Sequence, residues 1–344
     1  MTVMEVRASG LTAQELFFRL PYHVYKDDPV WVPENKAAMN IFPDSAAEVK
    51  RIPLLALSGG KAVARLLCTV HPASYGDDGR RQGWIGFFEA LPGHEELVGE
   101  LLHRAEMALT ALGAASVIAP KTDNHAMGFV SKGFHLPQTV LTMHNPPYYP
   151  RLFTGAGYSL RNRAISFYFR RRNFHPRQIK LPAIRTREFN RNNLANEIKH
   201  FNRLQNAIFT SRSGYIPRTL PEDEQLIQSF LPHLDDDLII FAEKECGEPV
   251  GILLCLPDVN QLKKDPRITR TRIISIGVIP GWEGKGAGKA MGYHLMQNLL
   301  RKTKYEEVEA SWIQSDNIPP QILALKFGAK QGRQFTLLEK TLAV

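Results

Sequence analysis

The sequence contains few cysteines and no long apolar run. Cys68, Cys246 and Cys255 are the three cysteines among 344 residues, and they form neither a Cys-x-x-Cys pair nor a zinc-site spacing. Such a set argues against disulfides and a structural metal and is typical of reducing compartments. No apolar stretch approaches the about 18 residues of a membrane-spanning helix, and residues 1–20 lack the plan of a signal peptide. We therefore expect a cytoplasmic protein without a membrane span.

Basic residues exceed acidic ones, 43 to 34, which gives a net charge of +9. This excess favours an anionic partner, such as a nucleotide-bearing cosubstrate, an acidic carrier protein or RNA. The densest basic run, residues 161–180, mixes arginine with aromatic residues as nucleic-acid-binding segments do. A strand followed by a solvated connector explains the same pattern, and we favour that interpretation over nucleic-acid binding.

The length predicts two domains, because a single core rarely grows to 344 residues. Strands mixed with helices in each half indicate an α+β fold, with helices flanking a sheet. We place the boundary near 175–182, which gives domains 1–180 and 181–344. Residues 122–134 are expected to form a short helix and a turn, and the proline-punctuated segment 20–33 a loop.

The sequence IGVIPGWEGKGAGKA, residues 276–290, packs five glycines between a predicted strand and a predicted helix. The strand, 270–280, is expected to place Ile274, Ile276 and Val278 on one face. Such a turn can bind phosphate through backbone N–H groups and the positive end of the helix. The nucleotide P-loop is excluded, because Glu283 and Ala290 occupy its glycine and hydroxyl positions. The dinucleotide motif G-x-G-x-x-G is excluded as well, since its sixth position is Lys289.

The turn resembles the pyrophosphate loop of GNAT acyltransferases, [QR]-x-x-G-x-[GA], with Gly286 and Gly288 at the small positions. The segment SDNIPPQILALKFGA resembles the family's later helix, with Asn317 eleven residues before Gly328. The resemblance implies that backbone N–H groups from about 284 to 289 bind the diphosphate of coenzyme A. It also implies that the pantetheine arm lies between the strands that carry Val278 and Trp312. The cofactor-binding residues implied in this way are Val278, Ile279, Glu283, Gly284, Lys285, Gly286, Ala287, Gly288, Lys289 and Asn317.

Further segments extend the resemblance to tandem-GNAT N-acyltransferase-like proteins of bacteria. They are DDPVWVP (27–33), GFFEAL (86–91), NPPYY (145–149), LPDVNQ (256–261) and EASWIQSDN (309–317). The resemblance implies two GNAT-like domains, each a mostly antiparallel mixed sheet flanked by helices. It places the donor site in the second domain. The first lacks a Gly-x-Gly loop, since PGHEEL follows Leu91, and is expected to shape the acceptor pocket or to support the core.

Two residues depart from the family pattern. Glu283 stands where the loop normally has glutamine or arginine, which puts affinity for free acyl-CoA in doubt. Ala324 stands where many GNATs have a tyrosine that protonates the departing thiolate. Water can replace that proton donor, because a thiolate is a good leaving group.

Transfer of an acyl group to an amine requires a base and a donor to the developing oxyanion. The resemblance implies that the N–H near Val278 is the oxyanion donor. The candidate bases are Glu309 and Asp258, for which a surface acid and a turn residue are the structural alternatives. Ser311 shares one strand face with Glu309. Asn317 is a candidate for orienting a water molecule or the pantetheine, and a helix N-cap is its alternative.

The predicted function is therefore an N-acyltransferase that uses acyl-CoA or an acyl carrier protein as donor and an amine of a small molecule or amino acid derivative as acceptor. Acyl-CoA would be a co-substrate, and no permanently bound cofactor is expected. Two alternatives remain. An aminoacyl-tRNA-dependent transferase would show salt-sensitive RNA binding, and a non-catalytic acyl-CoA-binding module would bind the donor without turnover.

Overall fold

The computed structural model describes residues 1–7, 9–34, 48–122, 126–173, 184–212 and 214–343. The chain divides into two compact units, one formed by Met1–Ala164 with Arg333–Val344 and the other by Ile165–Gly332. The division therefore falls before the expected boundary at 180, and the last strand returns to the first unit. Among the described residues no helix combines the length and apolar character that a membrane span needs.

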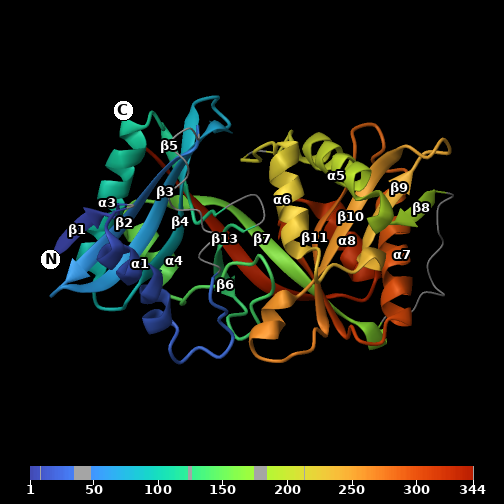
Figure 1. Cartoon of the computed structure of the whole chain (residues 1–344). Coiled ribbons are helices and arrows are strands. Elements are labelled where there is room, and N and C mark those ends of the chain that lie inside the picture. The colour runs from blue at the N-terminus through green and yellow to red at the C-terminus, as the bar shows by residue number, and fades with distance from the viewer. Residues whose placement is uncertain (8, 35–47, 123–125, 174–183, 213, 344) are drawn as a thin grey trace. The chain divides into compact units, whose positions relative to one another are not determined.

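The first unit has a sheet in the order β1-β2-β3-β4-β5-β13, and β6 pairs with β13 (Figure 1). Its strand pairs are antiparallel except for β4 with β5. Its elements are β1 (Thr2–Glu5), α1 (Leu11–Val24), β2 (Lys50–Ser58), β3 (Lys61–Tyr75), β4 (Arg81–Ala90), α3 (Glu95–Ala111), β5 (Ser116–Ala119), β6 (Phe129–Lys132), α4 (Tyr149–Gly155) and most of β13 (Lys330–Thr341).

The second unit has the strand order β7-β12-β11-β10-β9-β8, with β11 and β12 parallel and the pairs from β8 to β11 antiparallel (Figure 1). Its elements are the end of β7 (Ser159–Arg170), β8 (Arg185–Glu188), α5 (Leu194–Phe209), α6 (Leu220–Phe230), β9 (Ile239–Glu243), β10 (Pro249–Pro257), β11 (Arg270–Val278), α7 (Ala287–Arg301), β12 (Glu307–Gln314) and α8 (Ile318–Lys326).

Each face of the second sheet is covered by a pair of helices. Apolar residues of α7 recur every three or four positions, as in Ala287, Met291 and Leu295, and they pack with α8 on one face. Residues of α5 and α6, including Phe201 and Ile227, form a separate core on the other face. The sheet therefore separates two environments, and a residue's position along a strand decides which one its side chain enters.

Two local predictions are wrong. Residues 129–132 form strand β6 rather than part of a helix, because they pair with β13; residues 123–125 lie outside the described part of the chain. The expected loop at 20–33 begins inside α1, which continues through Pro21 to Val24. Phe17, Leu20 and Pro21 are buried there, and burial of this apolar face offsets the helix-breaking tendency of proline.

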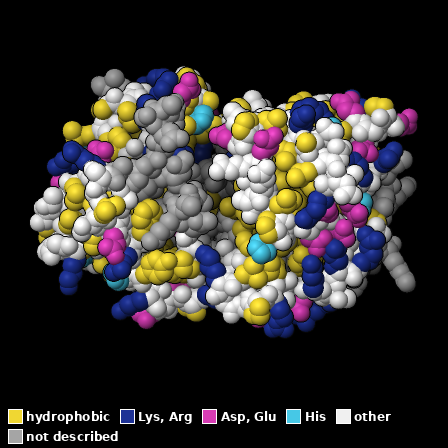
Figure 2. All heavy atoms as spheres, viewed as in Figure 1, with side chains coloured by type: hydrophobic (Ala, Val, Ile, Leu, Met, Phe, Trp, Pro, Cys, Tyr) yellow, Lys and Arg dark blue, Asp and Glu magenta, His cyan; other side chains and the backbone are white. Residues whose placement is uncertain are grey.

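Part of the basic run at 161–180 is neutralised by ion pairs. Arg161 contacts Glu339 and Asp77, and Arg170 contacts Glu307 at 3.2 Å. On the face of the molecule in Figure 2, lysine and arginine side chains are interspersed with acidic ones. Residues 174–180 of the run lie outside the described residues.

Candidate functional site

Strands β11 and β12 start as a parallel pair and then diverge. They pair from Arg270 with Glu307 to Ile273 with Ala310, where the pairing stops. Beyond that point β11 stays paired with β10 through Val278, while β12 runs on to Gln314. A gap therefore opens between the two strands toward their carboxyl ends, where the glycine turn follows β11.

A β-bulge lies where the divergence begins. The register of β11 against β10 shifts between the pairs of Ser275 and Ile273, which leaves Ile274 as the extra residue. Ile274 packs with the α5 core, whereas Ile276 and Val278 pack on the side of α7 and α8. The prediction that these three residues share one face is therefore wrong, because the bulge changes the alternation.

The backbone of Val278 faces the gap. The N–H of Ile279 donates to the carbonyl of Val250 on β10, at 2.9 Å. Because successive backbone groups of a strand point to opposite sides, the N–H and carbonyl of Val278 point away from β10. An extended ligand in the gap could pair with them as an added strand does.

The glycine turn presents a run of unpaired N–H groups at the start of α7. Gly284 and Gly286 have φ angles of 72° and 88°, a region that glycine adopts without strain. Gly286 is the N-cap of α7, and no side chain caps the helix. The N–H groups of residues 284–288 have no hydrogen-bond acceptor among the described residues. This arrangement, together with the helix dipole, suits an anion with several oxygen atoms.

The acidic residue of the turn points back into the turn. The carboxylate of Glu283 accepts a hydrogen bond from the N–H of Gly281, at 2.6 Å. It therefore stabilises the turn without itself capping α7. The ammonium of Lys285 lies 4.6 Å from the centre of the Trp282 ring, a cation–π contact that holds a positive charge beside the free N–H groups. Lys289, in the first turn of α7, is half-buried.

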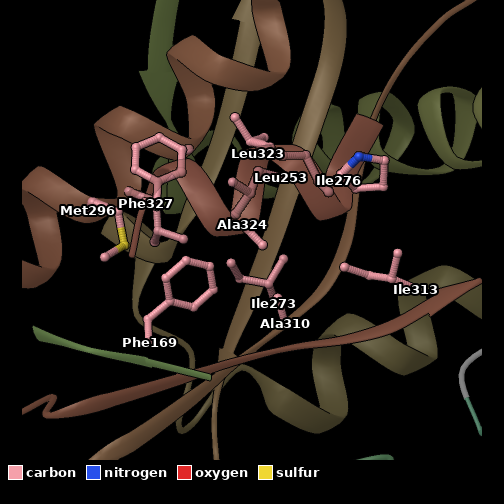
Figure 3. A pocket seen from close by; sticks show the side chains of 13 residues that line it. Phe169, Leu253, Ile273, Ile276, Met296, Ala310, Ile313, Leu323, Ala324 and Phe327 are labelled. Carbon is pink, nitrogen blue, oxygen red and sulfur yellow. The ribbon is translucent and has the colours of Figure 1, made fainter. Parts of the chain in front are cut away.

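An apolar pocket adjoins the gap on the face covered by α7 and α8 (Figure 3). Ile276 and Ile313 line it from the two diverging strands. Ala324 of α8, at the position where the family pattern has tyrosine, is buried and lines the pocket too. With no hydroxyl at this position, α8 supplies only apolar atoms to the pocket.

The opposite face carries buried polar residues at the base of the gap. Glu309 is fully buried, and its carboxylate accepts a hydrogen bond of 2.8 Å from the hydroxyl of half-buried Tyr168. Arg272, which pairs in register with Glu309, donates from Nε to the hydroxyl of Ser311 at 2.9 Å. The view of Glu309 as a surface acid is therefore wrong.

Sequence reasoning missed Tyr168 and Arg272. Tyr168 is a polar residue between two phenylalanines, and that contrast was the available signal; Arg272 follows Arg270 and Thr271 at the polar start of its strand and gave no such signal. The pairing of Arg272 with Glu309 depends on the register of β11 and β12, which no local pattern reveals.

Helix α5 packs closely against the same face of β11. A Cβ atom on Gly277 would lie 2.5 Å from Cγ2 of Ile208, so this approach needs glycine or a shift of the Ile208 side chain. Gln205 of α5 donates to the hydroxyl of Ser275 at 2.8 Å. These contacts bring polar groups of α5 to the bulge, where the gap begins.

The remaining two candidate residues lie in different places. Asp258 is at the other end of β11, where its N–H donates to the carbonyl of Arg270 and its carboxylate accepts from the guanidinium of Arg270 at 3.0 Å. This is the paired end of the strands, so Asp258 is not brought to the gap. Asn317 is the N-cap residue of α8 by position, but its side chain makes no capping hydrogen bond.

The first unit contains the corresponding strands, but hydroxyl groups occupy the end of its β4. Strands β4 and β5 pair in parallel only from Gln82 to Trp84. At Ala90 the N–H donates to the hydroxyl of Tyr149 at 2.7 Å, and the carbonyl accepts from the hydroxyl of Tyr148 at 2.5 Å. The Tyr149 hydroxyl also donates to Glu89 at 2.7 Å.

Residues 202–329 match the model of the acetyltransferase (GNAT) family. No curated protein matches the chain. The match includes β11, the glycine turn, α7, β12 and α8, and therefore the whole gap of the second unit.

Solved structures match the whole chain. A tandem GNAT protein from the clavulanic acid biosynthesis pathway has a TM-score of 0.62 and 12% identity over 100% of this chain and 99% of its own. A GCN5-related N-acetyltransferase from Sphaerobacter thermophilus has a TM-score of 0.60 and 17% identity over 99% and 96%. The glucosamine N-acetyltransferase region of a fungal GH3 β-N-acetylglucosaminidase gives 0.60 and 14%; the match covers 98% of this chain and 38% of that one. These likenesses establish a fold of two GNAT-like domains.

Proposed function

Because residues 202–329 are a domain of the acetyltransferase (GNAT) family, we propose that this chain is an N-acyltransferase. It moves an acyl group from acyl-CoA, or from an acyl carrier protein, to an amine. The observation that carries the proposal is the run of unpaired N–H groups at 284–288, which stands at the open end of the gap between β11 and β12.

The donor binds through its phosphates and its pantetheine arm. The N–H groups of 284–288 and the ammonium of Lys285 hold the phosphate oxygens, since charge-assisted hydrogen bonds are the strongest available there. The pantetheine arm enters the gap and pairs with the backbone of Val278. Asn317, which is half-buried and does not cap α8, is the candidate for a further polar contact with the donor.

The chemistry requires a neutral amine and a stabilised oxyanion. The amine nitrogen attacks the thioester carbonyl, the C–N bond forms, and the C–S bond breaks with release of the thiolate. A backbone N–H of β11 in the gap, at Val278 or two residues earlier, donates to the oxyanion. The excess proton of the nitrogen passes through the Tyr168 hydroxyl to Glu309, which is too deeply buried to meet the amine itself.

The first domain binds no donor and serves to shape the acceptor pocket or to support the fold. Its β4 backbone at Ala90 is already hydrogen-bonded to Tyr148 and Tyr149. We therefore expect one donor site per chain.

Calorimetric titration of the whole chain with coenzyme A and acetyl-CoA tests the donor site. We expect saturable binding at one site per chain, followed by thiol release when a suitable amine is added. Absence of binding to either compound would contradict the proposal for free acyl-CoA. Binding without thiol release across a broad set of amines would favour a non-catalytic module, and salt-sensitive tRNA binding instead of CoA binding would favour the tRNA-dependent alternative.

A further inference from the structure

The apolar pocket beside the gap extends past the point where β11 and β12 diverge. Ile276 and Ile313 line it from the parts of β11 and β12 that have separated, and Ile273 and Ala310, the last pair of the two strands, line it as well. Leu253 of β10 and Phe169 of β7 line it as well (Figure 3). The pocket therefore continues from the gap along the face covered by α7 and α8.

The chemistry of the pocket suits an alkyl chain. All thirteen lining residues are apolar, so a polar ligand would lose hydrogen bonds to water without replacement. The cavity measures about 40 Å³, which is room for about three water-sized spheres. A space this narrow suits an unbranched chain better than a ring.

Small side chains keep this space open in an otherwise close-packed core. Ala310 of β12 and Ala324 of α8 both line the pocket, and both are almost fully buried. Protein interiors leave few voids, because each void forfeits packing contacts. A void that continues into a predicted donor site is therefore a candidate binding site for the acyl group, which is the part that differs between donors.

We propose that this pocket binds the acyl chain of the donor, and that the preferred donor carries an unbranched acyl group longer than acetyl. This inference rests on the proposed function, since the thioester must lie in the gap for its chain to reach the pocket. From a carbonyl beside the β11 backbone, the chain would pass Ile273 and Ala310 toward Phe169, into space that Ala324 leaves free.

The test is calorimetric titration of the whole chain with CoA and with acetyl-, butanoyl-, hexanoyl- and octanoyl-CoA. Each buried methylene should tighten binding by about fourfold until the pocket is full. Ala324→Phe should remove this gain while CoA and acetyl-CoA bind within about twofold of the wild type. Leu325→Phe is the matched control on the same helix, because its side chain is 58% exposed, and it should keep the full gain.

Three results would overturn the proposal. Equal affinity across the series would show that the pocket takes no chain, while binding of CoA would leave the proposed function standing. Loss of CoA binding itself in folded Ala324→Phe, but not in Leu325→Phe, would assign the pocket to the pantetheine. No binding of any of these compounds would remove the proposed function together with this inference. If Ala324→Phe fails to fold, the wild-type series and the milder Ala324→Val variant decide.

Discussion

Each unit contains a diverging pair of parallel strands, but different side chains surround the two gaps. In each, a parallel pair of strands separates after a few residues, β4 from β5 and β11 from β12. Each also has an irregularity in the longer strand, at Phe87 with a φ of 49° and at the bulge residue Ile274. The gap between β11 and β12 adjoins an open apolar pocket. Beside the gap between β4 and β5, an aromatic cluster forms from Phe88, Phe129 and Tyr149. Backbone geometry alone therefore does not make a ligand site.

The helices that follow β4 and β11 also differ, in the charge and capping of their first turns. Helix α3 has Glu95 and Glu96 in its first turn, and these carboxylates complement the positive end of the helix. Helix α7 has no acidic residue in its first turn and no capping side chain. An anion would be repelled at α3 and attracted at α7.

Each unit also buries a carboxyl group that accepts a hydrogen bond from a tyrosine hydroxyl. Burial raises the pKa of Glu89 to about 8, so this carboxyl holds its proton at neutral pH and cannot take one from an amine. Glu309 accepts a hydrogen bond from Tyr168 and pairs in register with Arg272. We propose donor binding and proton transfer in the second unit alone, and four experiments test this difference between the units.

The largest expected effect comes from blocking the glycine turn. Gly288→Trp should abolish donor binding, because the ring covers N–H groups whose charge-assisted bonds are worth about 1.5–3 kcal/mol each. The fold should survive, since a Cβ at Gly288 meets no atom within 4 Å. His94→Trp, at the N-cap of α3, is the control in the first unit and should leave calorimetric CoA binding unchanged. The reverse pattern would place the donor in the first unit.

Removal of the buried carboxylate should affect turnover rather than binding. Glu309→Gln keeps the size of the side chain but not its basicity, and kcat should fall by about 10²–10⁴-fold. Donor affinity should change little, because Glu309 lies on the face opposite the pocket. Glu306→Gln, an exposed neighbour, should retain full activity. Equal kcat for Glu309→Gln and the wild type would remove Glu309 from the mechanism.

The raised pKa of Glu89 predicts a stability that depends on pH. The usual pKa is 4.5, and burial raises it to about 8. The folded chain therefore holds an extra proton between these values, so the stabilisation is complete below pH 4.5 and is lost as pH rises toward 8. Urea unfolding at pH 5 and pH 8 should show a loss of about 2–4 kcal/mol. Glu89→Gln should reduce this loss, whereas exposed Glu96→Gln should not; identical pH dependence in both variants would contradict the assignment.

The smallest effect concerns the hydroxyl at the end of β4. Tyr149→Phe leaves the N–H of Ala90 and the carboxyl of Glu89 without this partner, which should cost about 1–3 kcal/mol in urea unfolding. Tyr22→Phe, whose side chain is 49% exposed, should cost almost nothing. CoA should still bind at one site in Tyr149→Phe. A second donor site in this variant would show that the hydroxyl alone keeps the first unit from binding.

Much of the second unit was predictable, because its signals are local. The strand expected at 270–280, the glycine turn and the helix expected after it correspond to β11, the turn and α7. Local chemistry also located the unpaired N–H groups, because a glycine-rich turn before an amphipathic helix has few other ways to fold.

Other features depended on partners distant in sequence. Residues 129–132 became a strand because β13 pairs with them, although the local pattern suggested a helix. The bulge at Ile274 arises from the register against β10, and it moves one side chain to the other face. Tyr168 reaches Glu309 across 141 positions in the chain, a contact that no sequence pattern encodes.

Local sequence accounts for the unpaired N–H groups of the glycine turn, because glycines with positive φ and a helix without a capping side chain are consequences of nearby residues. Which strand gap is open depends on contacts between segments that are distant in sequence. Tyr148 and Tyr149, at the start of α4, hydrogen-bond to Ala90, which lies 58 and 59 positions earlier in the chain. Ala310 of β12 and Ala324 of α8, by contrast, line a pocket that remains empty. Whether such a gap is filled depends on which side chains the fold brings together, and packing is a property of that assembly rather than of any one segment.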